Sequence, residues 1–90
     1  MAIEVRIPTI LRTYTDGARS VEASGDTLRS LIADLESSYP GIQERIVDDS
    51  GLRRFVNVYL NDEDVRFLDG IETSLADGDV VTVLPAVAGG

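Results

Sequence analysis

The sequence predicts an α+β domain in which a mixed five-stranded sheet carries one main helix packed across it. Apolar residues alternate at the start of the chain, a central stretch has helical apolar spacing, and β-branched runs fill the last third. The expected order is strand, strand, helix, strand, strand, strand (β-β-α-β-β-β). Because one apolar helix stripe matches one apolar sheet face, the two layers can bury each other.

The first strand is predicted from residues 3–7, where isoleucine and valine alternate with charged side chains. Pro8 limits further pairing, because proline has no backbone N–H to donate. Asp16 and Gly17 are typical of a tight turn, and residues 18–23 form the returning strand. The connection between Pro8 and this turn is long for a hairpin.

The main helix is predicted from an apolar stripe with helical spacing, formed by Leu28, Leu31, Ile32 and Leu35. Residues 24–27 offer side-chain oxygens that can cap its start. Pro40 ends it, since proline disfavours helical geometry at the residue before it. A second, short helical turn is expected over residues 42–46 and a loop over residues 47–51.

The remaining three strands are expected in the second half of the chain. Residues 54–61 are β-branched and aromatic, as a strand requires, with Val56, Val58 and Leu60 pointing to one face. A short strand is expected around residues 65–67, and the last strand over residues 80–84.

Small domains with this order of elements include the ubiquitin-like β-grasp folds. Ferredoxin-like packings are the main competitor, but they usually need two helices of comparable length, and residues 42–46 do not supply the second one. We therefore expect a β-grasp domain over residues 1–85 and a flexible C-terminal tail over residues 86–90.

The charge of the chain restricts its partners. Eight arginines against sixteen acids give a formal net charge of −8, whereas nucleic-acid affinity rests largely on cationic side chains that neutralise phosphates. The composition argues against nucleic acid and favours a basic protein partner. No apolar run approaches the roughly 20 residues of a membrane span, and residues 1–4 lack the features of a signal peptide. We expect a cytoplasmic protein with no membrane partner.

The residue types that are missing restrict the chemistry. The chain has no cysteine and no histidine, so a disulfide framework, a redox motif, the usual zinc site and a Ser-His pair are all excluded. The acidic turns at residues 62–64 and 77–79 lack the spacing of a calcium loop, and solvated turns explain them better. We therefore expect no catalytic side chain, no metal and no bound cofactor.

The C-terminal tail is the candidate functional segment. Five residues beyond Pro85 can extend roughly 17 Å, and glycines let the backbone approach a reacting centre closely. The carboxylate of Gly90 is then the candidate reactive group, although a frayed end is the simpler explanation of two terminal glycines taken alone. The segment expected to thread into a partner is Pro85, Ala86, Val87, Ala88 and Gly89.

An apolar patch for docking partner enzymes is expected on the sheet face opposite the core. Phe55, Tyr59 and Leu84 are its candidate members. Placement in the core or as ordinary surface residues is the alternative for each, since scattered exposed apolar residues are normal.

Three segments carry a resemblance to a known family: residues 54–61, residues 75–79 and the ending over residues 81–90. With them, the chain resembles the MoaD/ThiS family of ubiquitin-like sulfur carrier proteins over its whole length. The segments 61–67 and 84–90 are most similar to the CysO-type carriers of cysteine biosynthesis. Molybdopterin-synthase subunits more often show consecutive prolines before the tail, where this chain has Pro85 alone.

The resemblance implies a protein co-substrate and not an enzyme. An E1-like adenylating and sulfurtransferase enzyme would join the Gly90 carboxylate to AMP with Mg-ATP, and sulfur would then displace AMP to leave a thiocarboxylate. In the CysO-type pathway, this sulfur attacks an aminoacrylate on a pyridoxal-phosphate (PLP) dependent cysteine synthase, and a metallopeptidase releases the cysteine. All cofactors belong to the partners.

Alternative functions stay open at this point. Molybdopterin, thiamin or a secondary metabolite could receive the sulfur in place of cysteine. A ubiquitin-like modifier would instead attach Gly90 to target lysines, and an interaction module would have an inert tail. A monomer is expected, because a carrier visits several enzymes in turn.

Overall fold

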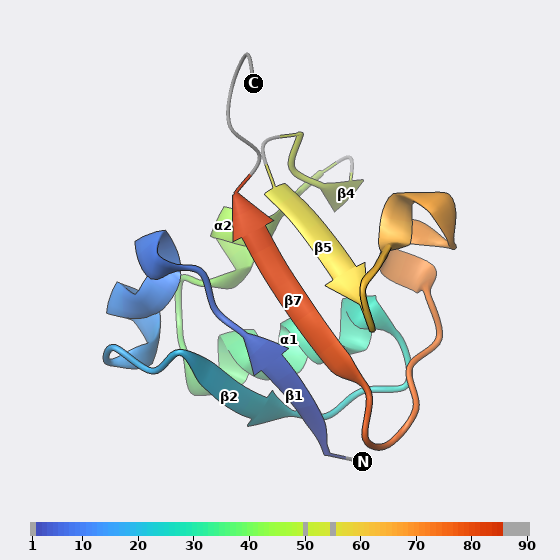
Figure 1. Cartoon of the computed structure of the whole chain (residues 1–90). Helices are drawn as coiled ribbons and strands as arrows, with labels where there is room; N and C mark the ends of the chain where they lie inside the picture. Colours follow the sequence, from blue (N-terminus) through green and yellow to red (C-terminus); the bar gives the residue numbers. More distant parts are fainter. Residues whose placement is uncertain (1, 50, 55, 86–90) are drawn as a thin grey trace.

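The computed structural model describes residues 2–49, 51–54 and 56–85. Its main sheet has five strands in the order β2-β1-β7-β5-β6 (Figure 1). Strands β1 and β7 are parallel, and the other neighbours are antiparallel. The mixed five-stranded sheet is therefore confirmed. Its strands are β1 (Ile3–Arg6), β2 (Ser20–Ala23), β5 (Val56–Leu60), β6 (Glu63–Asp64) and β7 (Val80–Pro85).

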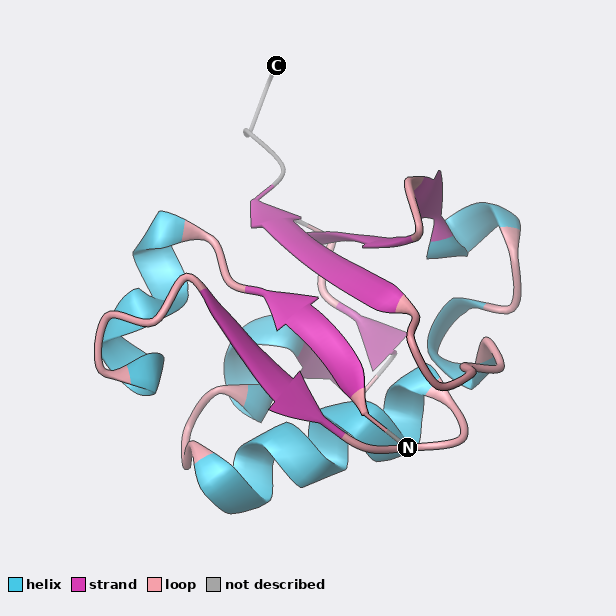
Figure 2. Ribbon diagram, turned by 60° about the horizontal axis from the view of Figure 1, so that its bottom comes forward, coloured by secondary structure: helices cyan, strands magenta, loops and turns pink. Residues whose placement is uncertain are grey.

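Helix α1 (Leu28–Ser38) lies across one face of the sheet (Figure 2). Thr27 caps its start, because the side chain accepts from the backbone N–H of Ser30 while Ser30 Oγ accepts from the N–H of Thr27. The helix ends at Ser38, and its C-cap residue, Tyr39, directly precedes Pro40. In the described part of the chain, no helix is long and apolar enough to cross a membrane.

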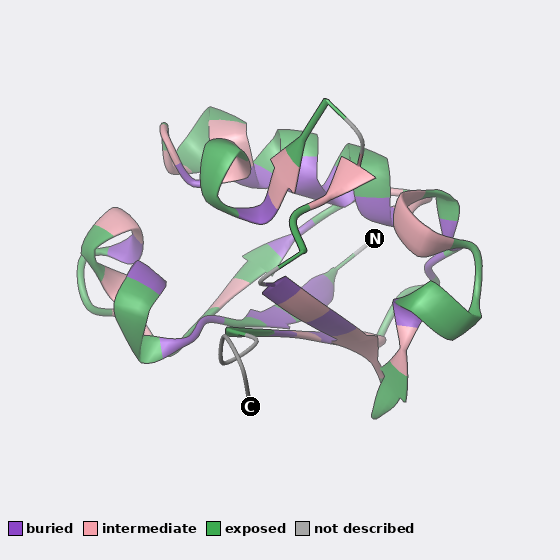
Figure 3. Ribbon diagram, turned by 90° about the horizontal axis from the view of Figure 1, so that it is seen from above, coloured by how far each residue is buried: buried purple, intermediate pink, exposed green. Residues whose placement is uncertain are grey.

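The core lies between α1 and the sheet, where the buried residues of both layers face each other (Figure 3). All four residues of the predicted helical stripe are buried. The alternation of β1 is also confirmed, since Ile3 and Val5 are fully buried and Glu4 and Arg6 are exposed. The sheet contributes Ile3, Val5, Ala23, Val56, Val58, Val81 and Val83.

The long connection between β1 and β2 is a 3₁₀ helix, η1 (Thr9–Thr15). Leu11 and Thr15 point into the protein, whereas Ile10 stays 66% exposed. The turn predicted at Asp16 and Gly17 is confirmed, and both residues have positive φ values of 54° and 85°.

Two sequence expectations were wrong in detail. Residues 65–67 form the 3₁₀ helix η2 (Val65–Phe67) and not a strand, because Asp64 Oδ1 accepts from the N–H of Arg66 and starts a helical turn. The edge strand is β6, which precedes it. The loop expected over residues 47–51 contains β3 (Val47–Asp48), which pairs with β4 (Gly51–Leu52) as a small hairpin.

The other short elements connect the layers. Helix α2 (Gln43–Ile46) matches the short helical turn predicted there, and Ile46 anchors it in the core. A 3₁₀ helix, η3 (Gly70–Glu72), follows η2 on the side of β5 and contacts α1.

Candidate functional site at the end of strand β7

Strand β7 positions the candidate site, because it lies in the interior of the sheet and ends at the boundary of the domain. It is parallel to β1 on one side and antiparallel to β5 on the other. Val81 and Val83 are buried, whereas Leu84 and Pro85 are exposed. The chain therefore leaves the core after Val83.

The first residue of the predicted threading segment, Pro85, still belongs to the sheet. Pro85 lies opposite Val56 in the register of β7 and β5, at a strand end where the missing N–H is tolerated. Ala86, Val87, Ala88, Gly89 and Gly90 lie outside the described residues, so the expectations for them stay predictions.

The structure brings two of the three predicted docking residues to the same sheet face. Tyr59 lies opposite Thr82, and Leu84 lies opposite Asn57, two pairs further along the two strands. These side chains alternate with the buried valines, so they point away from α1. Leu84 is 40% exposed and Tyr59 is half-buried. Phe55 lies outside the described residues.

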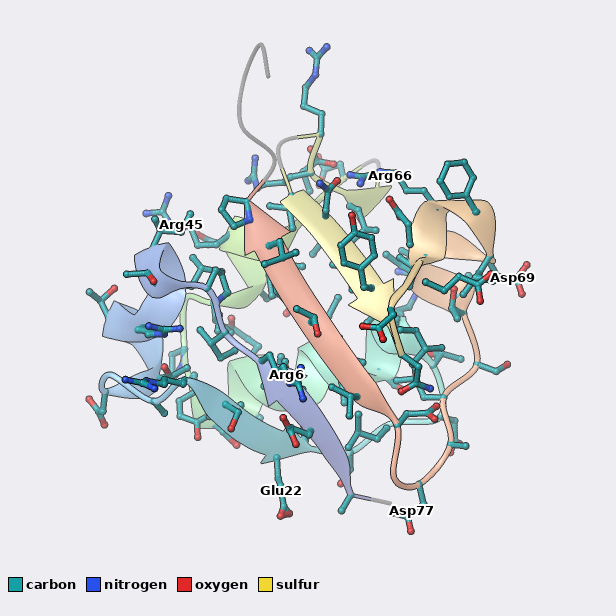
Figure 4. All side chains as sticks on the ribbon, in the orientation of Figure 1. Arg6, Glu22, Arg45, Arg66, Asp69 and Asp77 are labelled. Atoms are coloured by element: carbon teal, nitrogen blue, oxygen red, sulfur yellow. The ribbon has the colours of Figure 1, made fainter. Side chains whose placement is uncertain are left out.

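Arg66 fixes the start of β5 beside the end of β7. One Nη nitrogen donates to Asn57 Oδ1 at 2.8 Å, and the other donates to the carbonyl oxygens of Arg53 at 2.8 Å and Val56 at 2.6 Å. Hydrogen bonds from a charged donor are stronger than those between neutral groups. Arg66 therefore stabilises the start of β5, which pairs with the end of β7. In Figure 4, it lies toward the same end of the sheet as Arg45.

Two open hollows flank the end of β7. The first, of about 730 Å³, lies between η1, α2 and the start of β5 and includes Tyr14, Arg45 and Arg53. The second, of about 360 Å³, lies between η1 and β7 and includes Leu84 and Pro85. Ile10 lines both hollows.

Of the residues around these hollows, Leu84 and Pro85 are predicted from the sequence as site residues, whereas Ile10 and the arginines are not. Residues 9–15 are predicted only as a long connection, so the exposed apolar side chain of Ile10 in η1 is a finding of the structure. Arg53 and Arg54 are adjacent, but the other arginines around the hollows are dispersed along the chain, so no local pattern predicts that they gather.

Arg45 is held as a cation in the first hollow. Its Nε donates to the hydroxyl oxygen of Tyr14 at 2.7 Å, and its guanidinium lies 5.8 Å from the centre of the Tyr14 ring. This hydrogen bond, together with the charge interaction with Tyr14, raises the pKa of Arg45 above its usual value.

The acidic turns use their carboxylates to stabilise the backbone. Asp77 Oδ1 accepts from the N–H of Ala2 at 2.7 Å, and Asp79 Oδ2 accepts from the N–H of Ala76 at 2.8 Å. Within residues 2–49, 51–54 and 56–85, no group of three or more metal-binding side chains comes together. Asp77 and Asp79 therefore stabilise the turn at residues 77–79.

The fold and the strand that leads to the C-terminus define a ubiquitin-like protein of the β-grasp class. The ThiS family is matched over residues 5–90. The chain therefore belongs to the ThiS family of ubiquitin-like sulfur carriers.

Individual relatives agree with this assignment. The sulfur carrier protein CysO of Mycobacterium tuberculosis is 61% identical over 93 residues, with all of both chains covered. A chain in the crystal structure of the Amycolatopsis orientalis BexX/CysO complex matches with a TM-score of 0.94 at 57% identity, covering 99% of this chain and 100% of that one. Small archaeal modifier protein 3 of Haloferax volcanii is 47% identical over 66 residues, which are 73% of this chain and 67% of that protein.

Proposed function

We propose that this protein carries sulfur as a thiocarboxylate at Gly90 and donates it for cysteine biosynthesis. The observation that carries the proposal is the end-to-end similarity to the sulfur carrier protein CysO at 61% identity. The position of the tail supports it, since Gly89 and Gly90 follow an interior strand by only a few residues.

The proposed chemistry takes place in two steps on partner enzymes. The Gly90 carboxylate attacks the α-phosphorus of ATP, and pyrophosphate leaves to give an acyl adenylate. A sulfide or persulfide sulfur then attacks the acyl carbon and AMP leaves, with a reductant cleaving the S–S bond where a persulfide is the donor. The product is a thiocarboxylate. The activating enzyme supplies the nucleotide and Mg²⁺, and this chain supplies one carboxylate on an extended segment.

The proposed acceptor is an aminoacrylate on a PLP-dependent cysteine synthase. The thiocarboxylate sulfur adds to the β-carbon of the aminoacrylate, and an S-to-N acyl shift leaves cysteine attached to Gly90 through an amide. A metallopeptidase then hydrolyses this amide to release cysteine and regenerate the Gly90 carboxylate. The glycines suit this sequence because they add no side-chain bulk beside the reacting carbonyl.

Intact-mass analysis tests the proposal. The purified chain is incubated with the activating enzyme, Mg-ATP and a sulfide donor, with a reaction lacking ATP as the control. We expect an ATP-dependent mass gain equal to the exchange of one oxygen for sulfur, located at Gly90 by fragmentation. The activating enzyme is first shown to be active on a carrier protein that it is known to modify. An unchanged mass of this chain under the same conditions would then contradict the proposed function.

Protein modification is the second candidate, because small archaeal modifier protein 3 is also similar to this chain. The two functions share the adenylation step and differ in their products. A modifier forms amide bonds between Gly90 and lysines of target proteins, whereas a carrier accumulates free thiocarboxylate. Immunoblotting of cell extracts under reducing, denaturing conditions distinguishes them, since only lysine conjugates persist as larger species.

A further inference from the structure

The arginines of this acidic chain gather at the end of the domain where β7 finishes. Six of the eight arginines line the two hollows that flank this end, and Asp48 is the single acid among the described residues of the two linings. Arg6 is also ion-paired with Glu4, with 2.9 Å between Nε and Oε2, so five of the six arginines carry the excess of positive charge. The other two arginines and the other fifteen acids lie outside both linings. The hollow beside Tyr14 has Arg45, Arg53 and Arg54, and the hollow beside Leu84 has Arg6, Arg12 and Arg19.

Several of these guanidinium groups use one nitrogen to hold the domain together. The Nε atoms of Arg12, Arg45 and Arg53 donate to Ile7 O, Tyr14 Oη and Glu44 O. The Nη nitrogens of these three arginines make no hydrogen bond to the described residues. Arginine has five N–H donors in a planar fork that matches a carboxylate. The side chains are thus oriented by the protein while their outer nitrogens stay available.

An apolar ridge separates the two groups of arginines. Ile10 lines both hollows and is 66% exposed, while Leu84 and Pro85 line the second hollow and are exposed. An apolar centre with a polar and charged rim is the usual arrangement of a protein–protein interface. The arginine end, as we call the surface formed by the six arginines and this ridge, therefore fits a protein surface.

We infer that the arginine end docks onto an acidic rim around the entrance through which the activating enzyme receives the tail. This inference rests on the proposed function, because the activating enzyme is defined by its adenylation of Gly90. The net charge of −8 taken alone favours a basic partner. The arginines beside the end of β7 favour an acidic partner surface at that end. Carboxylates on the rim pair with the outer guanidinium nitrogens, and the apolar ridge packs inside the rim.

The distribution of charge also orients the approach. An acidic rim attracts the arginine end and repels the rest of the chain, where acids are in excess. Figure 4 shows Arg45 and Arg66 toward the end where β7 finishes, and Glu22 and Asp77 toward the opposite end. Steering of this kind raises the association rate and weakens with salt. The carrier therefore approaches the enzyme with the end of β7 foremost.

Charge reversal tests the inference. Arg19→Glu changes the second hollow at an exposed side chain that makes no hydrogen bond to the described residues, and Arg45→Glu changes the first hollow. Arg29→Glu on α1 is the matched control, because it makes the same change in charge at an exposed position outside both hollows. The measured quantity is kcat/KM for carrier in thiocarboxylate formation at low and high salt. Thermal unfolding monitors stability, and Arg19→Glu alone decides the result if Arg45→Glu unfolds.

We expect Arg19→Glu and Arg45→Glu each to lower kcat/KM about tenfold at low salt, and Arg29→Glu to stay within about twofold of the unmodified protein. The differences should shrink near roughly 0.5 M salt, where surface charges are screened. Equal effects of all three variants, or effects that do not depend on salt, would overturn the docking inference and leave the proposed function intact. Failure of the unmodified chain to form thiocarboxylate would overturn both.

A second copy of the chain is the competing occupant, since the acidic end of one molecule could meet the arginine end of another. Sedimentation of the carrier alone, with and without Arg19→Glu, distinguishes this case. A monomer in both samples supports docking onto the enzyme. A salt-sensitive oligomer that Arg19→Glu dissolves would overturn it.

Discussion

At the end of the sheet where β1 and β7 begin, carboxylates accept hydrogen bonds from the backbone, whereas at the end where both strands finish, guanidinium groups donate to it. Asp77 accepts from Ala2 N–H, and Asp79 accepts from Ala76 N–H. At the other end, Arg12 Nε donates to the carbonyl oxygen of Ile7 at 3.2 Å, and Arg66 donates to that of Val56. The turns leave different backbone groups without a sheet partner at the two ends, and each needs the opposite side-chain chemistry.

The comparison separates stabilisation from binding. The carboxylates at the first end hold turns of the backbone together, and the arginines with Nε engaged at the other end keep Nη donors that make no hydrogen bond to the described residues. The acidic end is therefore expected to affect stability, and the arginine end with its tail to affect function. The predictions below test that difference, from the largest expected effect to the smallest.

Deletion of Gly90 should have the largest effect, and only on function. The carboxylate would move back to Gly89, about one residue short of the reacting position, and misplacement by a few ångströms costs roughly 100-fold or more in rate. The rate of thiocarboxylate formation, measured by mass, gives the effect. Ala86→Gly is the control, since it changes the same segment without moving the carboxylate. A deletion variant as fast as the control would show that reach is unimportant.

Asn61→Ala should have the largest effect on stability. Asn61 Nδ2 donates to Asp79 Oδ1 at 3.0 Å and Asn61 Oδ1 accepts from Val80 N–H at 2.9 Å, while the backbone has a positive φ of 50°. Loss of both bonds and a less tolerant residue at this φ should lower the free energy of unfolding by about 2 kcal/mol. Chemical denaturation measures it.

Asn57→Ala is the matched asparagine variant at the end of the sheet where β7 finishes. It removes one acceptor, Oδ1, for Arg66, so a loss of only about 1 kcal/mol is expected. A larger loss of stability for Asn57→Ala than for Asn61→Ala would contradict the expectation that the end where β1 and β7 begin contributes more to stability.

Glu36 also accepts hydrogen bonds from the backbone, but it lies on helix α1, away from the two ends of the sheet. Its oxygens accept from Gly41 N–H and from Gln43 N–H at 3.0 Å. These hydrogen bonds, that from Gly41 first, lower the pKa of Glu36 below its usual 4.5. The stabilisation is therefore present above the unfolded pKa and is lost as pH falls through the lower folded pKa.

Glu36→Gln should reduce this pH dependence. We expect a lower Tm than the unmodified protein at pH 7, by less than Asn61→Ala causes, and convergence of the two Tm values as pH falls below 4.5. Thermal unfolding from neutral to acidic pH measures both curves. A constant difference in Tm at every pH would mean that the charge of Glu36 is not involved.

The exposed pair of Arg29 and Glu72 should have the smallest effect. Their side chains approach within 3.1 Å but remain about 60% exposed (62% and 60%), and such pairs contribute only about 0.5 kcal/mol or less. Glu72→Gln should change the free energy of unfolding by no more than this in chemical denaturation. A larger loss would require a role for Glu72 in holding η3 against α1.

Local patterns in the sequence predicted most of the secondary structure. The apolar spacing of α1, the alternation of β1 and the turn at Asp16 depend only on near neighbours, and all three are confirmed. Residues 65–67 were assigned wrongly because Val65 and Phe67 have strand propensity, whereas the hydrogen bond from Arg66 N–H to Asp64 decides for a turn. In so short a segment, one local hydrogen bond outweighs propensity.

For the candidate site, the sequence by itself determined the terminal glycines, the apolar strand that leads to them, and the alternation that leaves Tyr59 and Leu84 on the outer face. Only the tertiary structure decided what surrounds the tail. Arg12 comes from η1, Arg45 from α2, and Arg53 from the connection between β4 and β5, and they line the two hollows beside the end where the parallel strands β1 and β7 finish. Pairing between distant strands is not encoded in any local period, so the acidic composition does not predict that arginines lie beside the end of β7.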